Sequence, residues 1–212
     1  MFVRFAALCL ATLLPLAAVA QPKAPAAPAK QTFVFNDPNN RDTITFVLDA
    51  PLEVINGLSN QVKGSITVEG NKASGKLAVP VSSIKTGNET RDGHLQNEKW
   101  LDAAKYPDIV VEFKDLVLPG PLEPGKSVKL KTQGKFSIHG VTREEPVEVT
   151  AFYLKESEDT GKRAPGDLLR VRAKFQIPLE AYKINRTGAL ILKVAEMADV
   201  SVDAWGSTQF KL

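Results

Sequence analysis

The sequence is nearly without cysteine and poor in histidine. Its 212 residues include one cysteine, Cys9, which excludes a disulfide framework and any zinc site built from several cysteines. The two histidines, His94 and His139, lie in different predicted elements, and a metal site would need both together with a carboxylate. Neither charge sign is in excess, with 27 Lys and Arg against 24 Asp and Glu. Because a protein dedicated to nucleic acids carries a strong basic excess, we expect no nucleic-acid partner.

The motifs of the common enzyme classes are also missing. The chain contains no Gly-x-Ser-x-Gly, no His-Glu-x-x-His, no Walker loop and no Gly-x-Gly-x-x-Gly. Asp92, Asp102, Glu144 and Glu145 could supply acid–base pairs, but their places near predicted turns favour solvated charges. We therefore expect no catalytic residues, metal or cofactor. An enzyme that acts on a lipid through one of its histidines and a carboxylate is kept as an alternative.

The longest apolar run lies at the N-terminus. Phe5–Val19 ends in Ala18-Val19-Ala20, the small-x-small pattern of a cleaved secretory signal. The run is shorter than the roughly 20 apolar residues that span a bilayer comfortably. Cys9 lies inside the run and follows a large residue, which rules out a lipoprotein signal. Residues 1–20 are therefore predicted to be a signal peptide, cleaved before Gln21, and the mature protein is expected to be periplasmic or secreted.

An alanine- and proline-rich linker is predicted at residues 21–31. Its prolines at 22, 25 and 28 recur with the period of polyproline II, and its composition offers nothing to bury. We interpret this segment as a semi-stiff tether, which leaves residues 32–212 as a single domain.

From Thr32 onward the apolar residues recur at every second position. Eight segments show this alternation: 43–48, 65–69, 77–81, 109–114, 128–138, 147–151, 169–179 and 199–204. Such segments bury one face and expose the other to water, as in antiparallel sheets. Turn-forming residues lie between them, at 37–40, Asn56-Gly57, Gly70-Asn71, 119–121 and Pro165-Gly166. The pattern predicts a mainly β fold of about eight strands, a sandwich or, preferably, a closed barrel, which leaves no exposed edges.

Residues 86–105 break this pattern, since they hold few β-branched and many polar residues. Thr86 and Glu89 have the spacing of a capping box, so we expect a short helix within Asn88–Leu101. The residues that would pack this helix against the sheet are its apolar ones, Leu95, Trp100 and Leu101. A second short helix or turn is expected at Leu179–Ile184.

Three blocks of sequence match, in order, the signature of a known protein family. Residues 83–95 read Ser-Ile-Lys-Thr-Gly-Asn-Glu-Thr-Arg-Asp-Gly-His-Leu, and Trp-Leu-Asp-Ala-Ala-Lys-Tyr-Pro-Asp-Ile follows at 100–109. Residues 134–143 read Gly-Lys-Phe-Ser-Ile-His-Gly-Val-Thr-Arg, and the third block is Ile184-Asn185-Arg186. Together they resemble the signature of the YceI-like, polyisoprenoid-binding family. The chain departs from that pattern at Trp100-Leu101, at Glu144-Glu145 and over Thr187–Met197.

The resemblance implies an exported bacterial protein with an extended, lipocalin-like antiparallel β-barrel and one or two short helices. It also implies that the lumen holds a long isoprenoid or similar amphiphilic lipid, for storage or transport. The candidate lumen residues are apolar residues of the alternating segments: Phe46, Leu77, Val79, Val111, Leu130, Val149 and Phe175. An eight-stranded barrel can also be filled by its own side chains. A stress-related structural or interaction protein with a solid barrel and no ligand is therefore the alternative.

Arg91, Asp92 and His94 lie near the start of the predicted helix. They could form a polar rim that holds a ligand head group, or they could anchor the helix to the barrel. Adjacent charges near a helix start suit capping and local ion pairs, which favours the anchor. Besides a lipid-like small molecule, transient contact with a membrane or membrane protein and a homodimer are compatible with the sequence.

Overall fold

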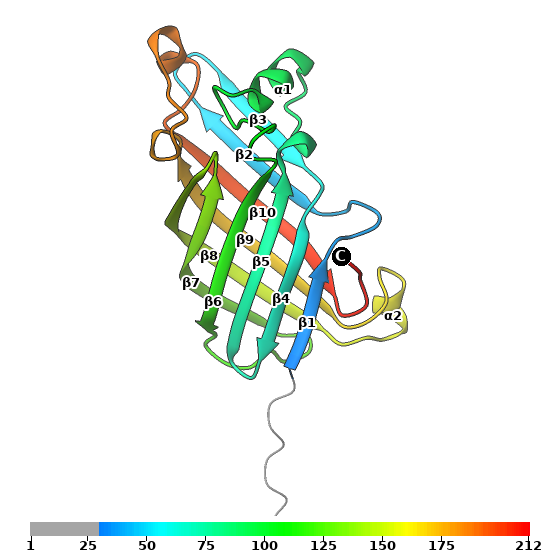
Figure 1. Ribbon diagram of the computed structural model, residues 1–212. Coiled ribbons are helices and arrows are strands. Elements are labelled where there is room, and N and C mark those ends of the chain that lie inside the picture. Colours follow the sequence, from blue (N-terminus) through cyan, green and yellow to red (C-terminus); the bar gives the residue numbers. More distant parts are fainter. Residues whose placement is uncertain (1–29) are drawn as a thin grey trace, which may run out of the picture.

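The computed structural model describes residues 30–212, which form a closed antiparallel β-barrel (Figure 1). Its ten strands are β1 (Lys30–Phe35), β2 (Thr43–Asp49), β3 (Val54–Ser59), β4 (Lys63–Glu69), β5 (Lys72–Pro80), β6 (Asp108–Val117), β7 (Ser127–Ile138), β8 (Val141–Leu154), β9 (Leu168–Pro178) and β10 (Met197–Ser207). The predicted signal peptide and most of the predicted linker lie outside the described residues. Lys30 and Gln31, which end the predicted linker, belong to β1.

The ten strands occupy eight positions around the barrel. The order is β1-β4-β5-β6-β7-β8-β9-β10, and pairing of β1 with β10 closes the ring. One edge of β10 carries both β2 and β1, since Val200 lies opposite Phe46 and Ser207 lies opposite Val34 further along. β3 pairs with β2, and β4 pairs with β1. All eight predicted strands form, and β1 and β3 are the two that the alternation did not reveal.

The prediction of a turn at Asn56-Gly57 is wrong. Both residues lie within β3, where Gly57 stands opposite Phe46 of β2. The phenyl ring lies over the glycine so closely that a Cβ at Gly57 would come within 2.0 Å of the ring. The glycine is needed here for space and not for a turn, because it leaves room for the Phe46 ring.

Buried apolar side chains form two clusters toward the two ends of the barrel. One cluster includes Ile138, Ile177 and Tyr182, and the other includes Tyr153 and Leu169. β9 contributes to both, since Ile177 and Leu169 lie on the same strand, eight residues apart. The clusters hold the barrel closed at its ends, while residues between them are only partly buried.

The ladder between β6 and β7 is short. Only Val110–Glu112 pair with Lys135–Ser137, although β6 has ten residues and β7 has twelve. β7 pairs with β8 over all twelve residues, and β6 pairs with β5 from Asp108 to Val117 with one bulge. The facing edges at 113–117 and 127–134 therefore have no ladder between them.

Helix α1 (Glu89–Gln96) forms within the predicted range and lies at one end of the barrel (Figure 1). The predicted capping box is wrong, because the cap is Asn88, whose side-chain oxygen accepts from the Arg91 amide at 3.0 Å. The Thr86 hydroxyl donates instead to Asp92 at 2.7 Å. A 3-10 turn, η2 (Glu180–Tyr182), occupies the second predicted helical segment.

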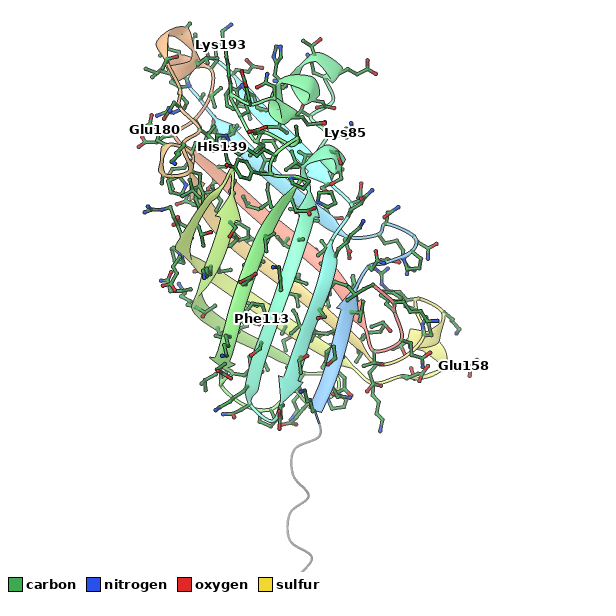
Figure 2. The ribbon with its side chains drawn as sticks, in the orientation of Figure 1. Lys85, Phe113, His139, Glu158, Glu180 and Lys193 are labelled. Carbon is green, nitrogen blue, oxygen red and sulfur yellow. The ribbon has the colours of Figure 1, made fainter. Side chains whose placement is uncertain are left out.

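Three further short elements were not predicted. They are α2 (Glu158–Gly161) and the 3-10 turns η1 (Val81–Ser83) and η3 (Gly188–Leu192). Figure 2 shows Lys193 and Glu180 at the same end of the barrel as His139, with Glu158 toward the other end. Within residues 30–212, no helix has the length and apolar character needed to cross a membrane.

Candidate ligand-binding cavity

A cavity of about 280 Å³ lies inside the barrel and is lined by residues from nine of the ten strands. Among its 39 lining residues the polar side chains are Ser59, Thr132 and Gln133, and the described residues contribute no charged one. The cavity approaches the size of ligand pockets, which range over roughly 300–1,000 Å³. The structure brings all seven candidate lumen residues to this one cavity: Phe46, Leu77, Val79, Val111, Leu130, Val149 and Phe175.

The cavity is long and narrow. Leu169 and Ile177 of β9 both line it, and eight residues of strand correspond to roughly 26 Å. Barrel strands tilt by roughly 35–45°, so this length becomes about 20 Å along the axis. An extended apolar chain suits such a space better than a compact ring system does.

The barrel is not filled by its own side chains. All seven candidate lumen residues face the cavity yet are only partly buried, which means that part of their surface meets no other protein atom. Phe136 and Phe175 pack with their ring centroids 4.7 Å apart at one side of the cavity. Native cores normally leave few voids larger than a water molecule, so an apolar space of this volume is unusual for a solid core.

Apolar side chains line both ends of the cavity. At the α1 end these are the predicted packing residues Leu95, Trp100 and Leu101, all of which pack against the adjacent core cluster. At the other end Leu118 and Leu122, in the segment between β6 and β7, line the cavity. Leu118 could have been found from its alternation with Leu116, whereas Leu122 lies among prolines and glycines that carry no periodic signal.

Asp92 and Arg91 are held in contacts that join α1 to the barrel. Asp92 Oδ1 accepts from the Thr86 amide at 2.8 Å and from the Thr86 hydroxyl at 2.7 Å. The hydroxyl donor holds the pKa of Asp92 below its usual value. Arg91 forms an ion pair with Glu53, in the turn between β2 and β3, at 2.6 Å. His94 is exposed on α1, and the helix residue that lines the cavity is Leu95.

A second polar group surrounds Tyr182, which is fully buried. Its hydroxyl donates to Glu145 at 3.1 Å, and burial raises the pKa of the Tyr182 phenol. His139 lies with Nδ1 3.1 Å from the Tyr182 carbonyl oxygen. Glu145 therefore points inward to a structural partner. The two histidines lie in separate parts of the fold, His94 on α1 and His139 in the turn between β7 and β8. Among the described residues no three His, Cys, Asp or Glu side chains are arranged to hold a metal ion.

A family model, the YceI-like domain, matches residues 36–204. The chain belongs to the YceI-like family. Proteins named UPF0312 from Vibrio campbellii and Pseudomonas fluorescens are each 29% identical to it, over 132 and 108 residues. These matches cover 59% and 50% of this chain, and 66% and 53% of the relatives' own lengths.

Solved structures share the fold. A polyisoprenoid-binding domain from Saccharophagus degradans, implicated in plant cell wall breakdown, has a TM-score of 0.61 at 15% identity, covering 85% of this chain and 98% of that one. Burkholderia cenocepacia BcnA has a TM-score of 0.54 at 14% identity, covering 77% and 95%. The YceI protein of Campylobacter jejuni has a TM-score of 0.54 at 19% identity, covering 70% and 82%.

Proposed function

We propose that this YceI-like protein is a binding protein that holds a long isoprenoid or similar amphiphilic lipid inside its barrel. The observation that carries the proposal is the apolar cavity of about 280 Å³, whose lining side chains retain uncovered surface. Each methylene buried there is worth at most about 0.8 kcal/mol, so a few isoprene units suffice for tight binding. The description of the Saccharophagus domain as polyisoprenoid-binding supports the same class of ligand.

The lining chemistry favours a range of related ligands. Its three polar side chains are too few to select among large head groups, so the apolar tail supplies most of the affinity. One methylene more or less in an apolar pocket changes affinity by only about 10–200-fold. We infer that several isoprenoid or acyl chains of similar length bind, with storage or transport as the role.

The role is proposed to be binding and not catalysis. The relative from Saccharophagus is described as a binding domain. In this chain His94 is exposed on α1 and His139 is held against the Tyr182 carbonyl, so neither side chain contributes to the lining of the cavity.

We further propose that the protein is exported to the periplasm or beyond, and the support is the signal-like sequence of residues 1–20. Intact-mass measurement of protein from the exporting compartment should give a chain that begins at Gln21. A product that retains Met1 would contradict the proposed cleavage.

Filling the cavity tests the proposed function. Val79→Trp points a large ring into the cavity, whereas Ala78→Trp places the same ring on the neighbouring residue, outside the lining set. Calorimetry with a polyprenol and a long-chain fatty acid should show at least about tenfold weaker binding to Val79→Trp and unchanged binding to Ala78→Trp. Both variants should remain folded, because the ring of Val79→Trp enters empty space and the ring of Ala78→Trp lies on the opposite face of the strand.

A solid core would respond differently, because overpacking typically costs about 1–3 kcal/mol. Destabilisation by Val79→Trp alone, together with no binding of either lipid to the unaltered protein, would refute the proposed function.

A further inference from the structure

Five large apolar side chains are exposed together at the α1 end of the barrel. They are Leu52 (68% exposed), Val54 (55%), Leu190 (37%), Ile191 (52%) and Leu192 (50%), and we call this set the apolar tip. Leu52 lies in the turn between β2 and β3, Val54 begins β3, and the other three form most of η3. The Leu52 amide donates to the Leu192 carbonyl oxygen at 2.9 Å, which joins the two segments into one surface.

Exposed large apolar side chains are concentrated at the apolar tip. Of the eight large apolar side chains that are exposed within residues 30–212, five belong to the apolar tip. Single exposed apolar residues are ordinary, but a contiguous group marks an interaction surface or a membrane contact. η3 and the turn between β2 and β3 lie at the outermost end of the barrel, so the group projects from the molecule (Figure 1).

The basic residue beside η3 favours an anionic partner. The loop between β9 and β10, residues 179–196, contains three basic residues and two acidic ones, Glu180 and Glu196. Arg186 is tied to Glu180 at 3.2 Å, and Glu53 is neutralised by its ion pair with Arg91. Lys183 and Lys193 then remain exposed on the loop, against Asp49 on β2 and Glu196 at the end of the loop. Lys193 directly follows η3, so the unpaired charge nearest to η3 in the sequence is basic. Figure 2 shows Lys193 beside η3 at this end of the barrel.

The size of the apolar tip argues for a bilayer and against a protein partner. Stable protein interfaces use roughly 20–30 residues of all kinds on each side, and the apolar tip is a small group of five apolar residues. Projecting apolar side chains flanked by lysines are suited to the boundary between lipid head groups and acyl chains, where anionic lipids attract the basic residues. The loop that carries η3 also begins beside Ile184, which lines the cavity.

We propose that the apolar tip docks the protein on anionic lipid bilayers, with Leu52, Ile191 and Leu192 inserted below the head groups. Docking there brings the α1 end of the cavity against the membrane. The inference goes beyond the proposed function, because it depends on an exposed surface and not on the cavity. Three of the five residues of the apolar tip lie in Thr187–Met197, the stretch where the sequence departs from its family pattern.

Co-sedimentation of the processed protein with vesicles tests docking. We expect binding to vesicles of phosphatidylglycerol and phosphatidylethanolamine, and much weaker binding to phosphatidylcholine vesicles. Ile191→Asp should lower partitioning to the anionic vesicles at least about tenfold, and Leu52→Asp, on the other segment, should act in the same way. Lys193→Gln should weaken binding to anionic vesicles only, and added salt should reduce that difference.

The matched control is Val117→Asp, which alters an equally exposed apolar residue (61%) on the far end of β6. It should leave partitioning unchanged. Equal partitioning of Ile191→Asp and the unaltered protein, or an equal loss in Val117→Asp, would overturn the proposal. So would a change of oligomeric state in Ile191→Asp, since the surface would then join two copies of the chain. Binding of a soluble prenyl probe without vesicles reports on the cavity alone, which keeps failure of docking distinct from failure of lipid binding.

Discussion

At the scale of single residues, Asp42 is the most unusual acid of the barrel. It is 1% exposed, and its Oδ1 accepts from the Trp205 amide at 2.9 Å. The other oxygen, Oδ2, is buried without a hydrogen-bond donor among the described residues. Burial raises the pKa of the Asp42 carboxyl to about 6, an effect that the Trp205 amide opposes and the nearby Asp37 carboxylate reinforces.

This raised pKa makes stability depend on pH. Between about pH 4 and pH 6 the native state keeps a proton on Asp42 that the unfolded state has lost, so this group's contribution falls as the pH rises. Asp42→Asn removes the titration and keeps an acceptor for the Trp205 amide. Relative to the unaltered protein, the variant should gain up to about 3 kcal/mol of unfolding free energy between pH 4 and pH 7. Urea melts at pH 4 and pH 7 measure this difference in unfolding free energy. Parallel profiles of stability against pH for the two proteins would show that Asp42 titrates normally.

At the scale of elements, β9 shows the alternation that defines the barrel. Phe175 points to the cavity and packs on Phe136, while Lys174 is exposed on the outer face. Phe175→Asp places an unpaired charge in apolar surroundings and should cost about 3 kcal/mol or more. Lys174→Asp should change stability by about 0.5 kcal/mol or less. Chemical denaturation compares the two, and similar losses would mean that the strand does not bury one face only.

Alternation predicted the long strands well, because each has one apolar face that the sequence displays directly. β3 was not predicted, because its residues do not alternate between apolar and polar. Apolar Val54 and Leu58 lie on its exposed face, and Gly57 lies on its buried face. The role of Gly57 depends on the Phe46 ring across the ladder, a partner that local sequence does not identify. The N-cap of α1 also depends on a contact that spacing alone does not identify. Thr86 has the spacing of a capping residue, but its hydroxyl donates to Asp92, and Asn88 is the cap.

The candidate site also has a part that the sequence predicts and a part that only the folded barrel shows. Inward-facing residues of the predicted strands could be named from periodicity, and all seven line the cavity. Whether the interior was hollow could not be predicted, because it depends on how all the strands close around a common axis. The pairing of Arg91 with Glu53 was equally inaccessible, since the two residues are 38 positions apart and meet only in the folded barrel.

At the scale of the whole molecule, the barrel combines two buried clusters with an empty centre. One cluster includes Tyr182 and Leu101, and the other includes Phe33, Phe35 and Leu169. The space between them is left available for a ligand. A bound chain would also stabilise the native state, because it binds the folded barrel and not the unfolded chain.

Native mass spectrometry of protein purified without detergent, followed by analysis of its organic extract, shows directly whether the barrel holds a lipid chain. We expect bound species that organic solvent releases and whose masses differ by whole isoprene or methylene units. After their removal, melting temperature should fall and should recover when a polyprenol or fatty acid is added back. The proposed lipid binding would be contradicted by protein that carries no extractable lipid and whose melting temperature is not raised by any added polyprenol or acyl chain.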